Sequence, residues 1–156
     1  MTLYYAGIGS RQTPPDVLDK FTTLAQVLEE KGYVLRSGGA EGADSAFAEG
    51  AITKEIYRPS MIKGEIGKRA MEIARQHHPA WHKCNEYVRK LHGRNAMIIL
   101  GEELNTPVEM VICWTVNGGT IGGTGLGISI AQSNSIPVIN FGNPFQSQLE
   151  VFSMMT

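Results

Sequence analysis

Short apolar segments with strand character alternate with segments of helical character, and this alternation most constrains what the chain can fold into. Strands are predicted at residues 3–6, 33–36, 55–57, 110–114 and 136–140. Helices are predicted at residues 14–31, 44–49, 64–77, 83–100 and 126–133. Because helices connect the strands, successive strands are expected to run in the same direction, in a parallel sheet with helices on both faces. We therefore expect an α/β fold with about five parallel strands, in a single domain over residues 1–156.

Two of the predicted helices depend on specific patterns. Thr13 is the expected N-cap and Pro14 the first residue of the first helix. Apolar residues of that helix recur at helical spacing: Val17, Phe21, Leu24 and Leu28. Residues 83–100 are ambiguous, because the run AMIIL by itself could form a buried strand. A helix is favoured there, since one helical face collects Val88, Leu91, Asn95 and Ile98.

Composition indicates a soluble protein of the cytoplasm. The chain has 156 residues and 42% hydrophobic content, enough for a packed core. Its formal net charge of −1 gives no electrostatic reason to expect nucleic-acid or membrane binding, although a local basic pocket remains compatible with it. No apolar run approaches the ~20 residues of a membrane helix. The two cysteines, Cys84 and Cys113, are far apart, and free thiols in a reducing compartment are expected.

Glycine-rich runs follow three of the predicted strands: GIGSRQ, SGGAEGAD and GGTIGGTGLG. Ligands of parallel sheets bind beyond the carboxyl ends of the strands, and helix N-termini there favour phosphate. Glycine also removes the Cβ that would block a ligand. We expect a nucleotide or nucleotide-derived small molecule, bound by Gly9, Ser10, Arg11, Ser37, Gly38, Gly39, Asp44, Arg94, Gly122, Gly123 and Thr124.

The alternative is that these glycines serve only tight turns and close packing. None of the runs matches the P-loop or the dinucleotide-binding glycine pattern. Within SGGAEGAD, Gly38 and Gly39 are expected to clear space for phosphate, and Gly42 to allow close helix packing. No cofactor is predicted.

All four histidines fall between His77 and His92. His78, His82 and Cys84 are chemically competent zinc ligands, but their spacing fits no standard site, so no metal is predicted. Trp81 could offer a stacking face for a base, or could be a core or dimer-interface aromatic residue.

The runs GIGSR, SGGAEGADSAFAEGA and IGGTGLGISIAQSNSIPVIN resemble, in this order, the SLOG superfamily, which includes DprA/Smf proteins and LOG phosphoribohydrolases. The segments HGRN (residues 92–95) and TPV…CWT (residues 106–115) are most similar to segments of small stand-alone DprA-like phage proteins. This resemblance implies one Rossmann-like domain, a homodimer or higher homo-oligomer, and glycine loops that bind nucleotides, as a sensor or a sequestering protein.

LOG enzymes carry a PGGxGTxxE motif whose glutamate works with an arginine at the N-glycosidic bond. Alignment on the glycines places Ser129 at the glutamate, so the resemblance does not carry that activity over. Arg94 is the candidate arginine, and Glu41 or Asp44 would have to replace the acid in a nucleotide N-glycosidic hydrolase. Otherwise Asp44 is a first-turn carboxylate favoured by the helix dipole and Glu41 a solvated loop residue. DprA-like binding of single-stranded DNA is a further alternative, weakened by the net charge.

Overall fold

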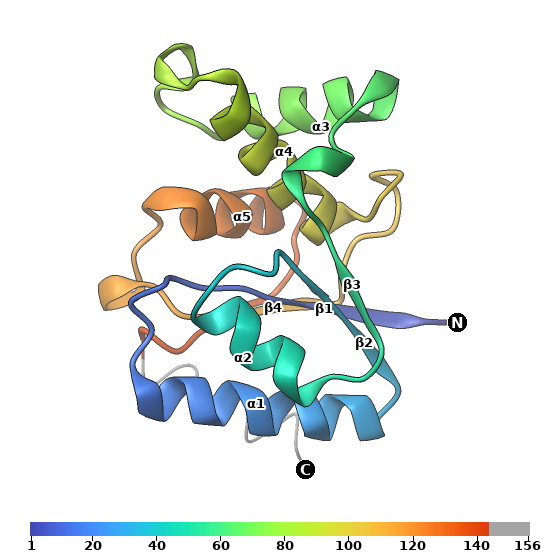
Figure 1. Cartoon of the computed structure of the whole chain (residues 1–156), viewed down its shortest axis with the longest axis vertical. Helices are drawn as coiled ribbons and strands as arrows, with labels where there is room; N and C mark the ends of the chain where they lie inside the picture. Colours follow the sequence, from blue (N-terminus) through green and yellow to red (C-terminus); the bar gives the residue numbers. More distant parts are fainter. Residues whose placement is uncertain (144–156) are drawn as a thin grey trace.

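The computed structural model describes residues 1–143 and contains one parallel five-stranded sheet (Figure 1). Its strands are β1 (Leu3–Gly7), β2 (Tyr33–Ser37), β3 (Lys54–Ile56), β4 (Met110–Cys113) and β5 (Val138–Asn140). They are ordered β3-β2-β1-β4-β5, and every neighbouring pair is parallel. The α/β prediction, with about five parallel strands, is confirmed.

Helices cover both faces of the sheet. They are α1 (Pro15–Glu30), α2 (Ala43–Gly50), α3 (Gly64–Gln76), α4 (Glu86–Leu100) and α5 (Gly122–Ser133). Three short 3₁₀ turns are η1 (Pro59–Met61), η2 (Trp81–Lys83) and η3 (Val116–Gly118). Figure 1 shows α1 and α2 on one side of the sheet and α3, α4 and α5 on the other. Within residues 1–143, no helix has the length and apolar character needed to cross a membrane.

The sheet separates two hydrophobic cores because alternate strand residues point to opposite faces. Tyr5 packs with α1 and α2, whereas its neighbour Ala6 packs with the core of α3, α4 and α5. On the first side, Phe21 and Phe47 stack with ring centroids 4.3 Å apart. Both faces of β4 are covered in this way, so all four of its residues are buried and its sequence is a continuous apolar run.

Residues 86–100 form a helix, as favoured over the strand. The side chain of Asn85 accepts a hydrogen bond from the Val88 amide and caps its first turn. The predicted start of α1 is wrong by one residue: Pro14 is the N-cap, and the Thr13 hydroxyl donates to the Ser10 carbonyl instead.

The start of α5 is also wrong, because the helix begins at Gly122 rather than at residue 126. Glycine is a poor helix former, but close packing requires it here. A Cβ on Gly125 would lie 2.2 Å from the Thr120 carbonyl group, and one on Gly127 would lie 3.1 Å from Ile8 Cδ1. Gly123 and Thr124 consequently belong to the first turn of a helix.

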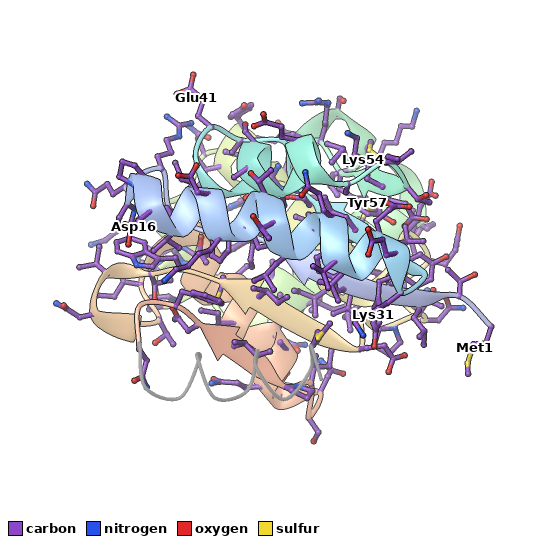
Figure 2. All side chains as sticks on the ribbon, turned by 90° about the horizontal axis from the view of Figure 1, so that it is seen from below. Met1, Asp16, Lys31, Glu41, Lys54 and Tyr57 are labelled. Atoms are coloured by element: carbon purple, nitrogen blue, oxygen red, sulfur yellow. The ribbon has the colours of Figure 1, made fainter. Side chains whose placement is uncertain are left out.

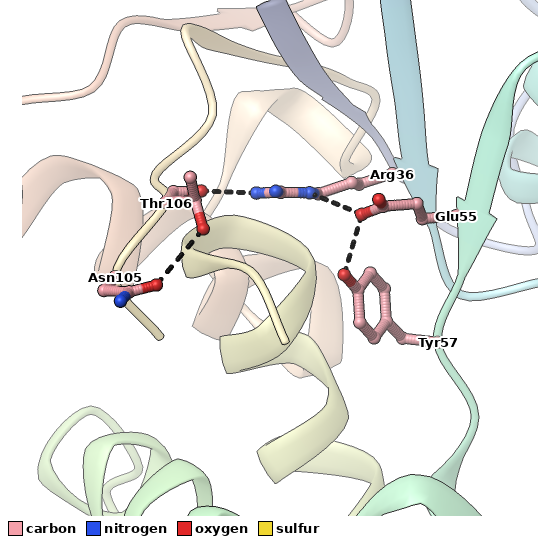
Figure 3. A network of polar contacts seen from close by, with 5 residues as sticks. All are labelled: Arg36, Glu55, Tyr57, Asn105 and Thr106. Atoms are coloured by element: carbon pink, nitrogen blue, oxygen red, sulfur yellow. Dashed lines mark hydrogen bonds and ion pairs between the residues drawn. The ribbon is translucent and has the colours of Figure 1, made fainter. Parts of the chain in front are cut away.

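A partly buried polar network connects the sheet to the loop after α4 (Figure 3). Arg36 on β2 is 3% exposed, and its Nε donates to the Glu55 carboxylate on β3 at 3.0 Å. The Arg36 guanidinium also donates to the Thr106 carbonyl and lies 3.8 Å from the centre of the Tyr4 ring. Tyr57, directly after β3, also donates to Glu55 at 2.8 Å, so this carboxylate binds Arg36 of β2 and Tyr57 together.

Candidate functional site

A cleft of about 480 Å³ opens beyond the carboxyl ends of β1 and β2, beside α4 and the first turn of α5. It therefore lies at the edge where parallel sheets bind ligands. Seven of the predicted ligand-binding residues line it: Gly9, Arg11, Gly38, Asp44, Arg94, Gly123 and Thr124. Residues from four distant parts of the sequence thus meet at one place.

Asp44 is the carboxylate of this cleft and is 6% exposed, in the first turn of α2. Its Oδ2 accepts hydrogen bonds from the amides of Gly38 (3.2 Å) and Ala40 (3.3 Å). Burial raises the pKa of Asp44 to about 6, against the opposing effects of these amides and of Arg94. The group can therefore gain or lose a proton near neutral pH.

Arg94 projects from α4 and is held by the loop after β2. Its Nη1 donates to the carbonyls of Gly38 (2.8 Å) and Tyr57 (3.2 Å), and its Nε donates to the Asn95 side chain at 3.0 Å. Burial lowers its pKa, while Asp44 acts in the opposite direction. Among residues 1–143, none accepts a hydrogen bond from Nη2, so this amino group is left for a ligand.

Gly38 makes room for protein groups rather than for phosphate, which corrects the sequence interpretation. A Cβ at this position would lie 2.6 Å from Arg94 Nη1 and 2.9 Å from Asp44 Oδ2. Gly39 has a φ of +70°, and its Cβ would lie 3.0 Å from Ile56 Cγ2 and 3.2 Å from Nη1 of Arg58, which lines the cleft. Both glycines therefore shape the site indirectly.

Gly42 brings two glycine loops together. Its φ is +89°, and a Cβ would lie 3.0 Å from the Ser10 carbonyl oxygen and from Arg11 Cα. Close helix packing was predicted for this glycine, and the structure shows that the start of α2 packs closely on the loop after β1 there.

Besides Gly39, four further predicted site residues do not line the cleft. Ser37 is fully buried and its hydroxyl donates to the Gly7 carbonyl at 2.6 Å, so it cannot reach a ligand in the cleft. Glu41 is exposed and points away from the molecule (Figure 2). Ser10 and Gly122 line an adjoining pocket of about 530 Å³, which shares Gly123 and Thr124 with the cleft.

Several lining residues were missed from the sequence, notably Arg58 and Tyr87. Arg58 follows β3, so its position after a third parallel strand was an available signal. Nothing in a single sequence indicates that Tyr87 lines the site, because only the packing of α4 brings it to the cleft. With Arg58 included, three arginines and one carboxylate line the cleft, which gives it a local positive charge despite the overall charge of −1.

Ser129, which aligns with the LOG glutamate, does not line the cleft. Its hydroxyl lies 2.8 Å from His77 Nδ1, in a separate pocket of about 450 Å³. The carboxylate chemistry of LOG enzymes therefore has no counterpart at this position. Trp81 was left open between a stacking face for a base and a core or interface residue. It does not line the cleft, and it packs against the core of α3, α4 and α5.

Fold and cleft define a class: a Rossmann-like α/β domain with its candidate site at the glycine loops. No family model and no curated protein matches the sequence. Among solved structures, the fold is similar to DNA processing protein A (DprA) from Helicobacter pylori, described for its mode of single-stranded DNA binding. The similarity has a TM-score of 0.59 at 21% identity and covers 88% of this chain and 64% of that one. At this identity it supports a DprA-like fold, and the chain spans less than two thirds of that protein.

Proposed function

We propose that the cleft binds a nucleotide or a nucleotide-derived molecule that carries a phosphate. The observation that carries this proposal is that Arg94 and Asp44 both bond the backbone of Gly38, Arg94 at its carbonyl and Asp44 at its amide. Both groups line one cleft, yet among residues 1–143 no carboxylate forms an ion pair with Arg94. Partly buried charges without a direct partner favour a ligand that supplies one.

The phosphate is expected at the arginines. Arg11, Arg58 and Arg94 supply positive charge, and Arg side chains bind phosphate oxygens in pairs. The first turn of α5 adds backbone amides at Gly123 and Thr124, at the positive end of a twelve-residue helix.

The nucleoside is expected at Asp44 and Tyr87. A carboxylate accepts hydrogen bonds from ribose hydroxyls or base N–H groups. Tyr87 is 60% exposed and lines the cleft, so its ring offers a face on which a base can stack. Such binding without turnover is what a sensing or sequestering protein needs.

The test is mass spectrometry of molecules released from the protein after incubation with nucleotides, cyclic dinucleotides and ADP-ribose derivatives. Recovery of one intact ligand per protein is the expected result. Arg58→Ala should weaken binding, whereas Arg69→Ala, a matched change at an exposed arginine outside the cleft, should not. If no compound is retained, or if both variants behave alike, this cleft is not a nucleotide site.

Hydrolysis of an N-glycosidic bond is a second candidate, favoured by the pKa of about 6 at Asp44. A carboxyl group that titrates near neutrality suits general acid or base catalysis. Product accumulating beyond one equivalent, and lost in Asp44→Asn but kept in Glu41→Gln, would establish it. The exposed Glu41 is no longer a candidate catalytic acid, because it lies outside the cleft.

Single-stranded DNA binding is the third candidate, favoured by the DprA-like fold and the three arginines. A gel shift with oligonucleotides that weakens steeply with salt would support it. No shift at low salt would remove it. The homo-oligomeric state stays a prediction, measurable by light scattering.

A further inference from the structure

Three metal-binding side chains meet beside the cleft, and the proposed function uses none of them as ligands. His78 and Cys84 lie in the connection between α3 and α4, on either side of η2, and His92 lies within α4. Each offers one ligand atom, and the three atoms lie within 4.8 Å of one another. We propose that His78, Cys84 and His92 form a site for a divalent transition metal, with zinc as the expected ion.

The separation of the His78 and Cys84 ligand atoms suits tetrahedral zinc. Bond lengths of about 2.05 Å to nitrogen and 2.3 Å to sulfur, at a tetrahedral angle, place the two ligand atoms about 3.6 Å apart. His78 Nε2 and Cys84 Sγ are 3.6 Å apart. Two imidazoles and a thiolate also form a donor set that zinc prefers over magnesium or calcium.

His92 supplies an independent observation. Its Nδ1 is buried and has no hydrogen-bond partner in the described part of the chain. Buried polar atoms are rarely left unpaired, and a metal ion at this nitrogen would provide the partner. The His78 and His92 rings already lie close, with centroids 4.7 Å apart.

A hydrogen-bonded arrangement competes with the metal. The Ala80 amide donates to His78 Nδ1 at 3.0 Å, which leaves the proton of the neutral ring on Nε2, facing Cys84. The Cys84 thiol in turn lies 3.7 Å from the Ala80 carbonyl. For zinc to bind at Nε2, the His78 proton must move to Nδ1, the Ala80 amide must turn away, and the thiol must release its proton to solvent.

The site is open on one side. His78 and His92 line the pocket of about 450 Å³ next to Ser129, so an ion can enter from there. Three protein ligands leave the fourth position of a tetrahedral ion to water. The sequence interpretation named His82 beside His78 and Cys84 as a competent ligand and predicted no metal. His82 is exposed and outside the cluster, and spacing alone does not reveal that α4 brings His92 back onto this connection.

Cobalt(II) titration of the metal-free chain is the direct test, followed by displacement with zinc. A thiolate-to-cobalt charge-transfer band that saturates at one ion per chain is expected, with the intense visible bands of tetrahedral cobalt. The other cysteine, Cys113, is buried in β4 with a pKa raised to about 12 by burial, so the band reports Cys84. Absence of the band in the unaltered protein overturns the proposal without any variant.

Variants then assign the ligands. Cys84→Ser should remove the band. His92→Gln should weaken zinc binding by on the order of 100-fold, because losing a ligand should cost at least as much as losing a residue that only hydrogen-bonds to a ligand. His82→Gln is the matched control and should change neither. Equal losses in His82→Gln and His92→Gln, or a band that survives Cys84→Ser, would place the metal elsewhere. Because the titration contains no nucleotide, its outcome is separate from that of the proposed function.

Discussion

The chain places an arginine near a carboxylate in two places, and the two differ in how the charges are satisfied. In the network on β2 and β3, Arg36 is paired directly with Glu55 and also bonds a carbonyl and covers a tyrosine ring. At the cleft, Arg94 donates to two backbone carbonyls and to the side-chain oxygen of Asn95. Asp44 accepts hydrogen bonds from backbone amides. The first pair is complete within the protein, whereas the second leaves its charges available to a ligand. The arginine without a direct carboxylate partner is therefore the one that we propose as a ligand-binding group.

The largest expected effect is the dependence of the free energy of unfolding on pH that Asp44 contributes. Its pKa of about 6 in the folded protein exceeds the ordinary value of 3.8, so between these values the folded state holds a proton that the unfolded state has lost. The free energy of unfolding should then fall as pH rises from about 4 to about 6, by about 3 kcal/mol in total. Asp44→Asn should abolish this fall, as measured by urea unfolding across the range.

Glu41→Gln is the control for that experiment, since it removes an exposed carboxylate from the same loop. It should leave the fall unchanged. An undiminished fall in Asp44→Asn would show that another group titrates, and the contrast between Asp44 and the paired Glu55 would lose its basis.

Arg36→Ala should reduce stability and leave ligand affinity unchanged. It removes a charge-assisted hydrogen bond and the packing on Tyr4. Because Glu55 is 40% exposed and can regain water, the expected loss is about 2 kcal/mol, less than for a fully buried pair. Urea unfolding measures the loss and calorimetry the affinity. A large loss of affinity with unchanged stability would reverse the roles assigned to the two arginines.

Arg94→Ala should show the opposite pattern. Loss of the proposed contact between Arg94 and phosphate is expected to weaken nucleotide binding about tenfold, or 1.4 kcal/mol, with a smaller effect on unfolding than Arg36→Ala. Arg94→Lys should recover only part of the affinity, because an ammonium group lacks the paired donors of guanidinium. Calorimetric titration with the nucleotide identified by mass spectrometry measures both. Full recovery by lysine would mean that only the charge matters.

The fold was predictable because it depends on periodicity. Two-sided burial makes β4 a continuous apolar run, and the helical spacing of Val17, Phe21, Leu24 and Leu28 fixes the buried face of α1. The start of α5 was not predictable, since the packing of Gly125 on Thr120 and of Gly127 on Ile8 overrides the low helix propensity of glycine.

The candidate site was predictable where it follows strand ends and unpredictable where it depends on side-chain direction. Arg11, Gly38 and Asp44 follow β1 and β2 and reach the cleft. Ser37 was misjudged because it belongs to β2, and the pleat turns its hydroxyl inward to Gly7. The meeting of His78, Cys84 and His92 depends on how α4 packs beside the preceding connection, which no spacing rule encodes.

The smallest expected effect separates the two halves of the proposed ligand. Tyr87→Leu keeps an apolar side chain but removes the aromatic ring, and the loss of base stacking should weaken nucleotide binding about threefold. Binding of inorganic phosphate should be unchanged, because the arginines that we propose to contact phosphate remain. Calorimetric titration of both probes into both proteins gives the comparison directly. If phosphate and nucleotide lose affinity equally, Tyr87 supports the cleft rather than a base. If the nucleotide alone is affected, the base lies over the first turn of α4, and Asp44 is left to the ribose.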